Sequence, residues 1–429
     1  MEISELYKRF LECGCVTTDT RNCPEGSMFF ALKGASFNGN TFASKAIESG
    51  CRYAVVDEAE YANDADGRII QVDDCLKALQ DMAALHRRTL GTRMIGITGT
   101  NGKTTTKELI AAVLKEKFNV LYTQGNLNNH IGVPLTLLKL TREHEMAVVE
   151  MGANHPGEIK FLVNIAQPDY GIITNVGKAH LEGFGSLEGV IRTKGELYDY
   201  IRSKKGTIFI QNENKYLNDI AGGIDCIRYG SGEGLNVSGS ITSCSPFLSF
   251  AWTAGDSKHE VSTHLIGSYN LDNALAAVTI GRYFGVDDKS ICHALSSYIP
   301  QNNRSQLVDT GRNKLVVDAY NANPTSMQAA LENFRLIEAP HKMAIIGDMK
   351  ELGESSHEEH QKIADMLSGC GFEKVILVGP EFGRTSHSFI RMNDAEEVRN
   401  YISHCKPEGY MILIKGSNSM KLAGLAEEL

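Results

Sequence analysis

Hydrophobic and polar positions along the chain follow two alternating patterns. Short apolar runs end in polar residues and glycine, and longer stretches between them carry apolar residues at helical spacing. In the first part of the chain, apolar runs at 27–32 and 53–56 predict buried strands, and residues 41–50 predict a helix closed by glycine. We therefore expect a mixed α/β N-terminal domain over residues 1–90.

The alternation continues over residues 91–300, where it predicts a central parallel α/β domain. An apolar run at 95–97 breaks into glycines and leads to a helical pattern at 107–114. Residues 207–265 form an uneven, β-rich stretch. This order of elements is typical of a sheet whose first strand leads through a loop into a helix.

Two further apolar runs of this region, 146–152 and 170–177, end in polar residues and glycine. In open α/β sheets, ligands bind at the carboxyl ends of the strands, so we expect Glu150 and residues 175–180 near the loop that follows 95–97. Glu150 is a candidate Mg²⁺ ligand there, with an N-cap or surface acid as the alternative. His180, taken by position alone, fits a satisfied, partly buried histidine better than a ligand.

The pattern restarts at about residue 301 and predicts a third domain over 301–429. Helical patterns such as residues 326–334 separate four apolar runs that each end in polar groups. These runs are residues 315–320, 343–348, 374–379 and 411–416. Strands that alternate with helices in this way indicate a second doubly wound, Rossmann-like sheet.

Composition narrows the class of protein. The chain has 429 residues and a formal net charge of −9, so we expect neither a nucleic-acid partner nor an anionic membrane surface. No stretch reaches about eighteen consecutive apolar residues, and the first residues lack the features of a signal peptide. The ten cysteines are scattered, without the paired Cys-x-x-Cys spacing of a zinc site. We expect a cytoplasmic monomer with free thiols.

Residues 98–105, Thr-Gly-Thr-Asn-Gly-Lys-Thr-Thr, have the features of a phosphate-binding loop. Glycines let backbone N–H groups approach phosphate oxygens, Lys103 neutralises the terminal phosphates, and Thr104 reaches Mg²⁺. The general motif requires glycine at position 97, where this chain has Ile97. The alternative is a glycine-rich turn that binds no nucleotide.

Other candidate residues remain ambiguous from their spacing. Arg21 and Lys33 flank a predicted strand and are candidates for holding a diphosphate, although surface solvation explains their spacing at least as well. Lys194 lies in a helical stretch, where a lysine usually solvates the exposed face. Asn270, near the start of another helix, is a better candidate for a cap than for a base contact.

Several segments together resemble the Mur ligases, the ATP-dependent amide-forming enzymes that build the peptidoglycan precursor. The resemblance covers all three predicted domains, and that family's own phosphate loop has the spacing seen at 98–105. The further segments that carry the resemblance are residues 125–136, 150–154, 318–324 and 347–353. These four segments, and the absence of an Asp-Asn-Pro-Arg motif, favour the branch of the family that acts last in the sequence of additions.

The resemblance implies a nucleotide site and gives each matching position one or more roles in it. Lys103, Glu150, His180 and Lys194 are the implied catalytic residues. Thr104, Glu150, His180 and Lys194 are the implied Mg²⁺ ligands, with Lys194 as a carbamate that binds a second ion. The residues implied to contact ATP are Gly99, Thr100, Asn101, Gly102, Lys103, Thr104, Thr105, Asn270, Arg304, Asp318 and Tyr320.

The resemblance also implies where the other substrates bind. The N-terminal domain would hold a uridine diphosphate sugar. The implied substrate-binding residues are Thr20, Arg21, Lys33, Gly34, Asn126, Asn128, Asn129, Asn321 and Asn323. Two positions depart from the family pattern, since Tyr269 replaces a usual histidine and residues 37–42 have an asparagine where a histidine is common.

The activity implied by this branch is the ATP-dependent addition of D-alanyl-D-alanine to UDP-N-acetylmuramoyl-tripeptide through an acyl phosphate. The cofactors would be ATP and two Mg²⁺ ions. The partners would be the two small-molecule substrates, UDP-N-acetylmuramoyl-tripeptide and D-alanyl-D-alanine. A folylpolyglutamate synthetase is one alternative, and the N-terminal domain argues against it. A phosphate-loop ATPase or nucleotide-regulated binding protein without ligase activity is the other.

Overall fold

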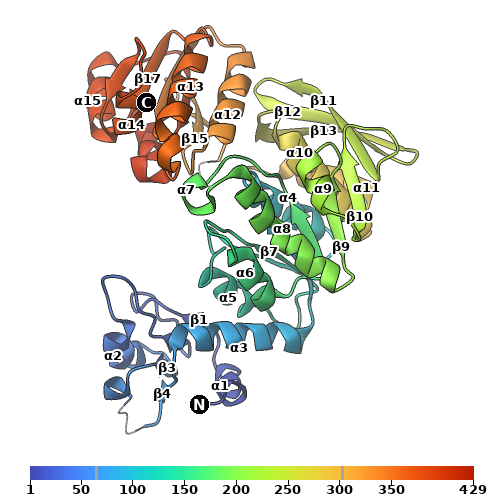
Figure 1. Ribbon diagram of the computed structural model, residues 1–429, viewed down its shortest axis with the longest axis vertical. Helices are drawn as coiled ribbons and strands as arrows, with labels where there is room; N and C mark the ends of the chain where they lie inside the picture. Colours follow the sequence, from blue (N-terminus) through green and yellow to red (C-terminus); the bar gives the residue numbers. More distant parts are fainter. Residues whose placement is uncertain (63–65, 301–303) are drawn as a thin grey trace. The chain divides into compact units, whose positions relative to one another are not determined.

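The computed structural model describes residues 1–62, 66–300 and 304–429 (Figure 1). Within these residues the strands form three sheets, of four, nine and six strands. The chain divides into two compact units, each described here in turn. The first unit comprises Met1–Gly96, Phe118–Gly152 and Ile159–Tyr170, and the second comprises Ile97–Lys117, Ala153–Glu158 and Gly171–Leu429.

The four-stranded sheet of the first unit is parallel throughout, in the order β1-β2-β3-β4. Its strands are β1 (Val16–Thr17), β2 (Met28–Phe30), β3 (Tyr53–Val56) and β4 (Ile69–Gln71). β2 and β3 are buried at every position, as expected for inner strands of a covered parallel sheet. The strands predicted at 27–32 and 53–56 are thus confirmed, whereas the short outer strands carry too few residues to show a pattern.

Five helices of the described residues belong wholly or mostly to the first unit. Among them, α2 confirms the helix predicted over 41–50, and α3 is the longest. The helices are α1 (Ile3–Phe10), α2 (Ala43–Glu48), α3 (Cys75–Leu90), α5 (Gly132–Leu137) and α6 (Glu158–Ala166), with 3-10 turns at Gly39–Phe42 and Ala59–Tyr61. The Asp74 side chain caps α3 by accepting from Lys77 N at 2.8 Å, and Gly91 ends it in a left-handed conformation. α3 packs against both α1 and α5.

The first unit also contains strands in the order β5-β7-β6. Their bounds are β5 (Arg93–Thr98), β6 (Val120–Tyr122) and β7 (Met146–Glu150). The chain passes into the second unit within β5, at Ile97. Every residue of β7 is buried, so the strand predicted at 146–152 is confirmed as an inner strand.

The second unit begins with the phosphate loop and α4 and continues through a sheet region in the order β13-β12-β11-β10-β9-β8. The strands are β8 (Tyr170–Ile173), β9 (Thr207–Gln211), β10 (Asp225–Gly230), β11 (Val237–Cys244), β12 (Phe247–Ala254) and β13 (Ser257–Ile266). β9, β10 and β11 pair in parallel, and β11, β12 and β13 form an antiparallel meander. The uneven β-rich stretch predicted at 207–265 corresponds to this change of direction.

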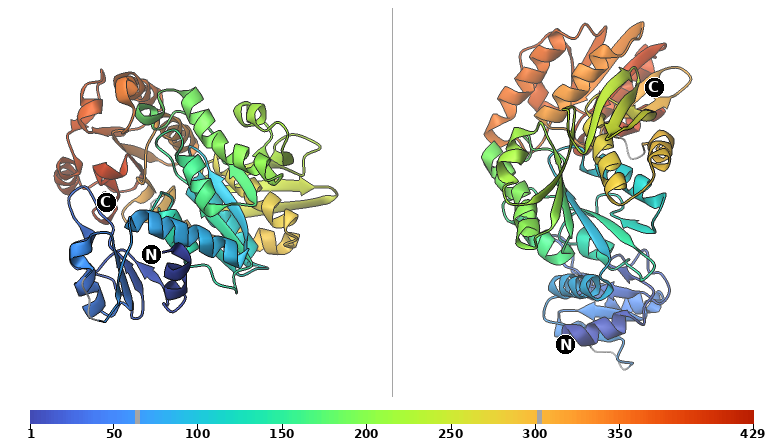
Figure 2. Two further views of the ribbon diagram at one scale, coloured as in Figure 1. Left: turned by 60° about the horizontal axis from the view of Figure 1, so that its bottom comes forward. Right: turned by 90° about the vertical axis from the view of Figure 1, so that its right-hand side faces the viewer.

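Helices cover both faces of these strands. They are α4 (Lys103–Lys115), α7 (Leu181–Phe184), α8 (Leu187–Ser203), α9 (Lys215–Ile220), α10 (Asn270–Tyr283) and α11 (Asp288–Ser297). Figure 2 shows the green helix α8 and the gold helices α10 and α11 on opposite sides of the strands. α10 packs on α4 and on β9, β10 and β11, which places its first turn beside the loop that precedes α4.

The last part of the second unit is a six-stranded sheet in the order β14-β15-β19-β16-β17-β18. Its strands are β14 (Gln306–Asp309), β15 (Lys314–Asp318), β16 (His341–Gly347), β17 (Lys374–Val378), β18 (Ile390–Met392) and β19 (Tyr410–Lys415). All pairs are parallel except β14 with β15. The four strands predicted at 315–320, 343–348, 374–379 and 411–416 are confirmed, and β14 and β18 add the two edges.

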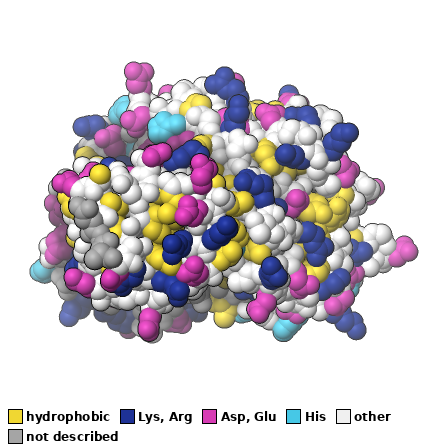
Figure 3. Space-filling model, turned by 90° about the horizontal axis from the view of Figure 1, so that it is seen from below, with side chains coloured by type: hydrophobic (Ala, Val, Ile, Leu, Met, Phe, Trp, Pro, Cys, Tyr) yellow, Lys and Arg dark blue, Asp and Glu magenta, His cyan; other side chains and the backbone are white. Residues whose placement is uncertain are grey.

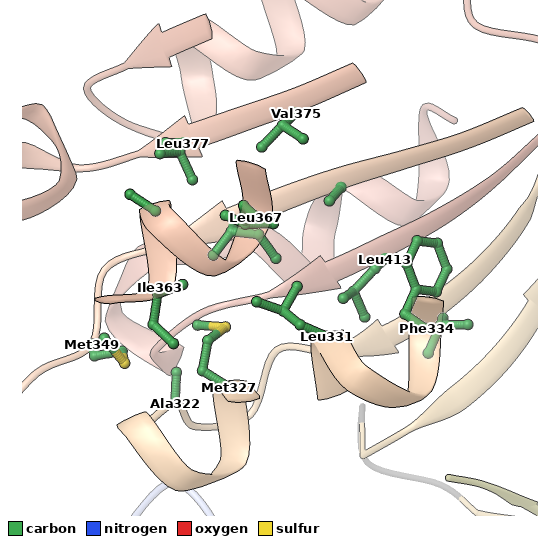
Figure 4. Packing of buried hydrophobic residues seen from close by; sticks show 14 of the residues in the cluster. Ala322, Met327, Leu331, Phe334, Met349, Ile363, Leu367, Val375, Leu377 and Leu413 are labelled. Carbon is green, nitrogen blue, oxygen red and sulfur yellow. The ribbon is translucent and has the colours of Figure 1, made fainter. Parts of the chain in front are cut away.

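Helices lie on both faces of this sheet, so the predicted doubly wound arrangement is confirmed. They are α12 (Pro324–Leu336), α13 (Ser356–Ser368), α14 (Pro380–Gly383) and α15 (Ala395–Cys405), with 3-10 turns at Gly353–Ser355, Asn418–Met420 and Leu422–Glu427. Alternate strand residues pack into two separate clusters. Val316 and Leu413 belong to one cluster with Met327 and Leu331 of α12, and Figure 4 labels Leu413, Met327 and Leu331. Leu315 and Ile412 belong to the other cluster, with Val398 and Ile402 of α15.

The surface has charges of both signs. On the face shown in Figure 3, Lys and Arg side chains alternate with Asp and Glu, and hydrophobic side chains lie between them. No helix within the described ranges has the length and apolar character needed to cross a membrane. In the same residues there is also no group of three or more His, Cys, Asp or Glu side chains placed to hold a metal ion.

Candidate active site

The phosphate loop joins β5 to α4, and its two inner glycines are required by the backbone. Gly99 has φ +146° and Gly102 has φ +76°, both in the region that favours glycine. A Cβ on Gly99 would lie 2.0 Å from Thr174 Oγ1, and a Cβ on Gly102 would lie 2.7 Å from Asn273 Oδ1. The loop is therefore confined between the residues that follow β8 and the first turn of α10.

Residues just after β8 hold this loop by hydrogen bonds. Thr100 N and Asn101 N donate to the backbone and side-chain oxygens of Asn175, each at 2.9 Å. Thr174 Oγ1 donates to Asn101 O at 2.6 Å, and Gly177 N donates to Thr100 Oγ1 at 3.0 Å. The loop geometry is thus fixed by the protein itself, which is the condition for binding phosphate without reorganisation.

Lys103 begins α4 and folds back over the loop. Its Nζ donates to Gly99 O at 2.9 Å and to Thr100 O at 3.0 Å. The cation and the N-terminal end of α4 therefore both face the loop, where positive charge favours an anion. Thr104 follows directly and is buried.

Asn273, in the first turn of α10, bonds to the first turn of α4 just after the loop. Its Oδ1 accepts from Thr106 Oγ1 at 2.9 Å, and its Nδ2 donates to Asn270 Oδ1 at 2.8 Å. Asn270 Nδ2 donates in turn to Ile266 O at 2.8 Å. Asn270 is the first residue of the helix and Tyr269 is its N-cap, so the capping interpretation of Asn270 is wrong.

Lys194 lies inside α8 with a relative exposure of 2%. The interpretation that it solvates a helix face is therefore wrong. Nζ donates to Ala153 O at 3.1 Å and lies 5.1 Å from the centre of the Phe184 ring. Burial, together with the charge of Lys103, lowers the pKa of Lys194 to about 7.

His180 has a left-handed backbone with φ +51° and precedes α7. Its Nδ1 contacts the carboxylate of Glu351, and Glu182 N donates to Glu351 O at 3.3 Å. The contact with His180 lowers the pKa of the Glu351 carboxyl. A histidine whose Nδ1 faces a carboxylate presents Nε2 for a ligand, the arrangement common at metal sites.

Glu150 ends β7 in the first unit and is 1% exposed, so it is no surface acid. Asn128 Nδ2 donates to Glu150 Oε1 at 2.8 Å, and Glu150 N donates to Thr123 Oγ1 at 3.0 Å. The segment after β7 runs close to Asn128, since a Cβ added to Gly152 would lie 3.1 Å from the Asn128 amide. Asn128 therefore orients the Glu150 carboxylate.

Two other asparagines of the 125–136 segment shape its turn. Asn129 Oδ1 accepts from Ile131 N at 3.1 Å and from Gly132 N at 2.9 Å, where α5 begins. Asn126 O accepts from Asn128 N at 2.7 Å. The structure thus gives these asparagines local partners within the first unit.

The candidates of the six-stranded sheet form one cluster at the end of β15. Asp318 Oδ2 accepts from Lys415 Nζ at 2.6 Å, and Asp318 Oδ1 accepts from Ser305 N at 3.3 Å. The Arg304 guanidinium lies 3.8 Å from the centre of the Tyr320 ring. Lys415 is 1% exposed and is the β19 partner of Asp318 in the sheet register.

Tyr269, the departure from the family pattern, contacts this cluster. Its hydroxyl lies 2.6 Å from Ser305 Oγ, in the residue that follows Arg304. Burial raises the pKa of Tyr269, so the phenol stays protonated and available as a donor. The substituted position thus connects the start of α10 with the start of the last sheet.

Asn321 and Asn323 lie in the turn between β15 and α12. Asn321 Oδ1 accepts from Ala322 N at 2.8 Å, and its carbonyl accepts from Lys415 Nζ at 3.3 Å. Asn323 caps α12 and also donates to Asn101 of the phosphate loop. Of the predicted substrate contacts, Asn323 is thus the one that meets the nucleotide loop.

The basic candidates of the N-terminal region form ion pairs with local acids. Arg21 pairs with Asp19 at 2.7 Å, and Lys33 pairs with Asp57 and Glu58, both at 2.9 Å. Thr20 O accepts from Cys23 Sγ at 3.7 Å in the same turn as Arg21. A Cβ on Gly34 would lie 2.2 Å from the Phe37 ring, so a larger residue there would require this exposed ring to turn away.

Sequence patterns alone miss four residues of this site. Asn273 and Thr174 confine the phosphate loop, Glu351 contacts His180, and Lys415 binds Asp318. Glu351 has one sequence signal, because it belongs to the 347–353 segment that carries the family resemblance. The other three act through tertiary contacts that spacing along the chain does not report.

Three family models match successive parts of the chain. The model described as Mur ligase family, catalytic domain, matches residues 12–87. The Mur ligase middle domain matches residues 97–281. The Mur ligase, glutamate ligase domain, matches residues 303–418. The chain therefore has three α/β domains, as predicted.

Relatives of the same kind match nearly the whole chain. UDP-N-acetylmuramoyl-tripeptide–D-alanyl-D-alanine ligase of Bacillus subtilis is 33% identical, over 96% of this chain and 92% of the relative. The crystal structure of MurF from Acinetobacter baumannii has a TM-score of 0.87 at 29% identity, covering 100% of this chain and 98% of that one. MurF ligase from Thermotoga maritima in complex with ADP has a TM-score of 0.85 at 27% identity, covering 98% of each chain.

Proposed function

Because the chain belongs to the Mur ligase family, we propose that it adds D-alanyl-D-alanine to UDP-N-acetylmuramoyl-tripeptide. ATP is consumed, and the products are the UDP-muramoyl-pentapeptide precursor, ADP and phosphate. The observation that carries this proposal is the full-length similarity to ligases named for that reaction. The buried Lys194 beside Lys103 adds a chemical argument, because a plain ATPase loop has no need of it.

We propose that ATP binds at the phosphate loop. The similar MurF ligase from Thermotoga maritima forms a complex with ADP, which supports a nucleotide site in this chain. Residues 99–105 would hold the phosphates, with Lys103 at the γ-phosphate. Asn270 would contact adenine through the hydrogen-bonding positions of its amide that are not used by its bonds to Ile266 and Asn273. Arg304, Asp318 and Tyr320 would contact the nucleotide from the last domain. Lys415 holds Asp318 in place, and the Arg304 guanidinium lies over the Tyr320 ring.

The donor chemistry of the candidate residues fits Mg²⁺. Thr104 offers a hydroxyl at the start of α4, Glu150 a buried carboxylate, and His180 an imidazole whose other nitrogen faces Glu351. Mg²⁺ is usually bound by few protein ligands together with phosphate oxygens and water. When bound, it neutralises phosphate charge during transfer.

Lys194 fits the proposed carbamate. Carbamate formation needs a neutral amine as nucleophile, and a pKa of about 7 provides one at neutral pH, whereas an ordinary lysine is almost fully charged there. The neutral amine attacks CO₂, and loss of a proton from nitrogen gives a carbamate anion, so an ordinarily cationic side chain becomes anionic. The resulting carboxylate would be the ligand of a second Mg²⁺.

The proposed chemistry follows from the inertness of a carboxylate toward amines. The terminal carboxylate of the tripeptide attacks the γ-phosphorus of ATP, and ADP leaves. The amine of D-alanyl-D-alanine then attacks the acyl phosphate, and the tetrahedral intermediate collapses to amide and phosphate. Lys103 and the loop N–H groups supply positioning and charge neutralisation for the first step.

We further propose the substrate side of the site. Thr20, Arg21, Lys33 and Gly34 would hold the uridine diphosphate sugar, which requires Arg21 and Lys33 to exchange their present carboxylate partners for the diphosphate. The remaining substrate contacts are proposed at Asn126, Asn128, Asn129, Asn321 and Asn323. The domain boundaries 1–90, 91–300 and 301–429, a monomeric state and a cytoplasmic location complete the proposal.

A substrate-matched assay tests the proposed function. We expect the purified protein to release phosphate from ATP only when UDP-N-acetylmuramoyl-tripeptide and D-alanyl-D-alanine are both present. Phosphate release with the tripeptide plus a single amino acid would assign the protein to another addition step. Release with ATP alone at the full rate would identify a plain ATPase.

A further inference from the structure

The N-terminus of α12 has a side chain with two separate tasks. Asn323 Oδ1 accepts from Ser326 N at 2.9 Å, and Asn323 N donates to Ser326 Oγ at 3.1 Å, which forms a capping box. Asn323 Nδ2 donates to Asn101 Oδ1 at 2.7 Å. The cap uses the side-chain oxygen, so the amide nitrogen is free to serve a second purpose.

The partner, Asn101, is at the centre of the phosphate loop. Its backbone N donates to Asn175 Oδ1, and its backbone O accepts from Thr174 Oγ1 and Asn175 Nδ2. Both backbone groups are thus committed to holding the loop. The side chain is the part of Asn101 that points to the last domain, and Asn323 is 6% exposed at the contact.

Other contacts bring the same two regions together. Gly177, which follows the segment that holds the phosphate loop, lies so close to α12 that a Cβ there would be 3.1 Å from Thr325 Oγ1. One residue further on, Lys178 pairs with Glu359 of α13 at 3.0 Å. The last domain therefore contacts both the phosphate loop and the segment that supports it.

We propose that Asn323 is a positioning residue that couples docking of the last domain, residues 304–429, to the phosphate loop through Asn101. This inference rests on the proposed function only for the identity of the nucleotide. It goes beyond the substrate contact proposed for Asn323, because it gives the amide nitrogen a second role through its bond to the nucleotide loop.

The coupling works in both directions. A nucleotide that fixes Asn101 in its present conformation favours docking of the last domain, and docking pre-forms the loop for the nucleotide. Loss of the Asn323–Asn101 hydrogen bond lowers the fraction of molecules in which the last domain is docked. The apparent nucleotide affinity falls with that fraction. A hydrogen bond between neutral groups, such as this partly buried one, corresponds to about a 3- to 10-fold change in affinity.

Asn323→Ser separates the two tasks of the side chain. Serine is as good an N-cap as asparagine, but it is too short to reach Asn101. We expect Asn323→Ser and Asn101→Ala each to raise the dissociation constant of a non-hydrolysable ATP analogue, measured by calorimetry with Mg²⁺, by about 3- to 10-fold. We expect the double variant to bind no more weakly than the weaker of the two single variants, because both remove the same contact.

Ser326→Ala is the matched control. It removes the other half of the capping box and leaves the amide pair intact, so we expect thermal stability to fall and analogue affinity to stay within 2-fold of the parent. If Asn323→Ser does not fold, Asn323→Thr provides the same test, since threonine also caps helices.

Three results would overturn the proposal. The first is that Asn323→Ser leaves the affinity for the ATP analogue unchanged. The second is that the fold-losses in affinity of the two single variants multiply in the double variant. The third is a higher KM for D-alanyl-D-alanine with nucleotide affinity unchanged, which would instead assign Asn323 to the dipeptide. Because the binding cycle needs no turnover, its failure is distinguishable from failure of the ligase assay.

Discussion

Lys194 lies in an environment that is unusual for a lysine. It is buried in α8, close enough to Lys103 for the second charge to lower its pKa further. Burying a charged ammonium is unfavourable, and the protein relieves this by holding the amine close to neutrality. A neutral amine is also the form that reacts with CO₂, so the burial has a chemical consequence.

We expect Lys194 to take up labelled CO₂ in a pH-dependent way. With a pKa lowered to about 7, the reactive neutral amine disappears as the pH falls below about 7 and predominates above it. An ordinary lysine would become reactive only near pH 10. The measurement is the ¹³C carbamate signal after equilibration with ¹³C-bicarbonate between about pH 6 and pH 8.

Lys194→Arg is the control for that signal, because a guanidinium does not form the carbamate under these conditions. The parent protein should show the signal and the variant should lose it. A signal of equal size in Lys194→Arg would place the carbamate elsewhere. A parent signal that appears only at strongly alkaline pH would contradict the lowered pKa.

Gly102→Ala should affect both stability and nucleotide binding. Alanine at φ +76° is strained by roughly 1–3 kcal/mol, and its Cβ would meet Asn273 Oδ1 at 2.7 Å. Relief of that contact requires the Asn273 side chain to give up its bonds to Thr106 and Asn270, or the phosphate loop to move. We expect a lower urea midpoint and loss of ATP-analogue binding.

Gly223→Ala provides the comparison. Gly223 has φ +75°, and a Cβ added there would meet no atom within 4 Å, so the same substitution adds strain without a collision. Its nucleotide affinity should equal that of the parent. Equal affinities for both variants would mean that Asn273 does not confine the loop.

At the level of elements, the strands that sequence patterns predict are those with enough apolar residues to require burial. β2, β3, β7 and β16 satisfy this condition and lie in sheet interiors. The edge strands β1, β4 and β18 have two or three residues, and their conformation is imposed by the neighbour with which they pair. Pairing of that kind leaves no periodic signal.

The same limit applies to the candidate site. The Gly-Lys-Thr sequence predicts the phosphate loop because its chemistry is local to one turn. Asn273 and Lys415 reach the site from distant elements, so their contribution depends on packing between elements. The roles implied for Glu150 and His180 stay predictions. The burial of Glu150 beside the Asn128 amide, and the contact of the half-buried His180 with the Glu351 carboxylate, give a physical reason to test them.

Lys415→Met tests how β19 supports β15. The substitution removes two hydrogen bonds that Lys415 Nζ donates. One goes to Asp318 Oδ2 at 2.6 Å and the other to the carbonyl of Asn321. We expect destabilisation of about 1–3 kcal/mol in urea unfolding, together with weaker ATP-analogue binding because Asp318 is no longer held. Asp318 is partly exposed, so water limits the loss.

Lys314→Met is the matched change, because Lys314 begins the same strand β15 at an exposed position. A surface substitution of this kind usually changes stability by less than about 0.5 kcal/mol. Comparable losses in the two variants would show that the effect comes from removing a lysine in general. Lost stability without lost affinity in Lys415→Met would remove Asp318 from the nucleotide site.

At the level of the whole molecule, the second unit contains the phosphate loop, Lys194, His180 and the last domain, whereas Glu150 and the N-terminal candidates belong to the first unit. Family models cover all three domains of the chain. The proposed reaction needs contributions from each of them, since it combines a uridine nucleotide, ATP and a dipeptide. The central claim is therefore about chemistry that no single domain performs.

Transfer of oxygen from the tripeptide to phosphate tests that claim most directly. The tripeptide substrate is prepared with ¹⁸O in both oxygens of its terminal carboxylate and incubated with ATP, D-alanyl-D-alanine and the protein. An acyl-phosphate mechanism predicts that each phosphate released carries one ¹⁸O, and that the new amide retains the other. Unlabelled phosphate, released in the same amounts, would show hydrolysis by water and would contradict the proposed ligase.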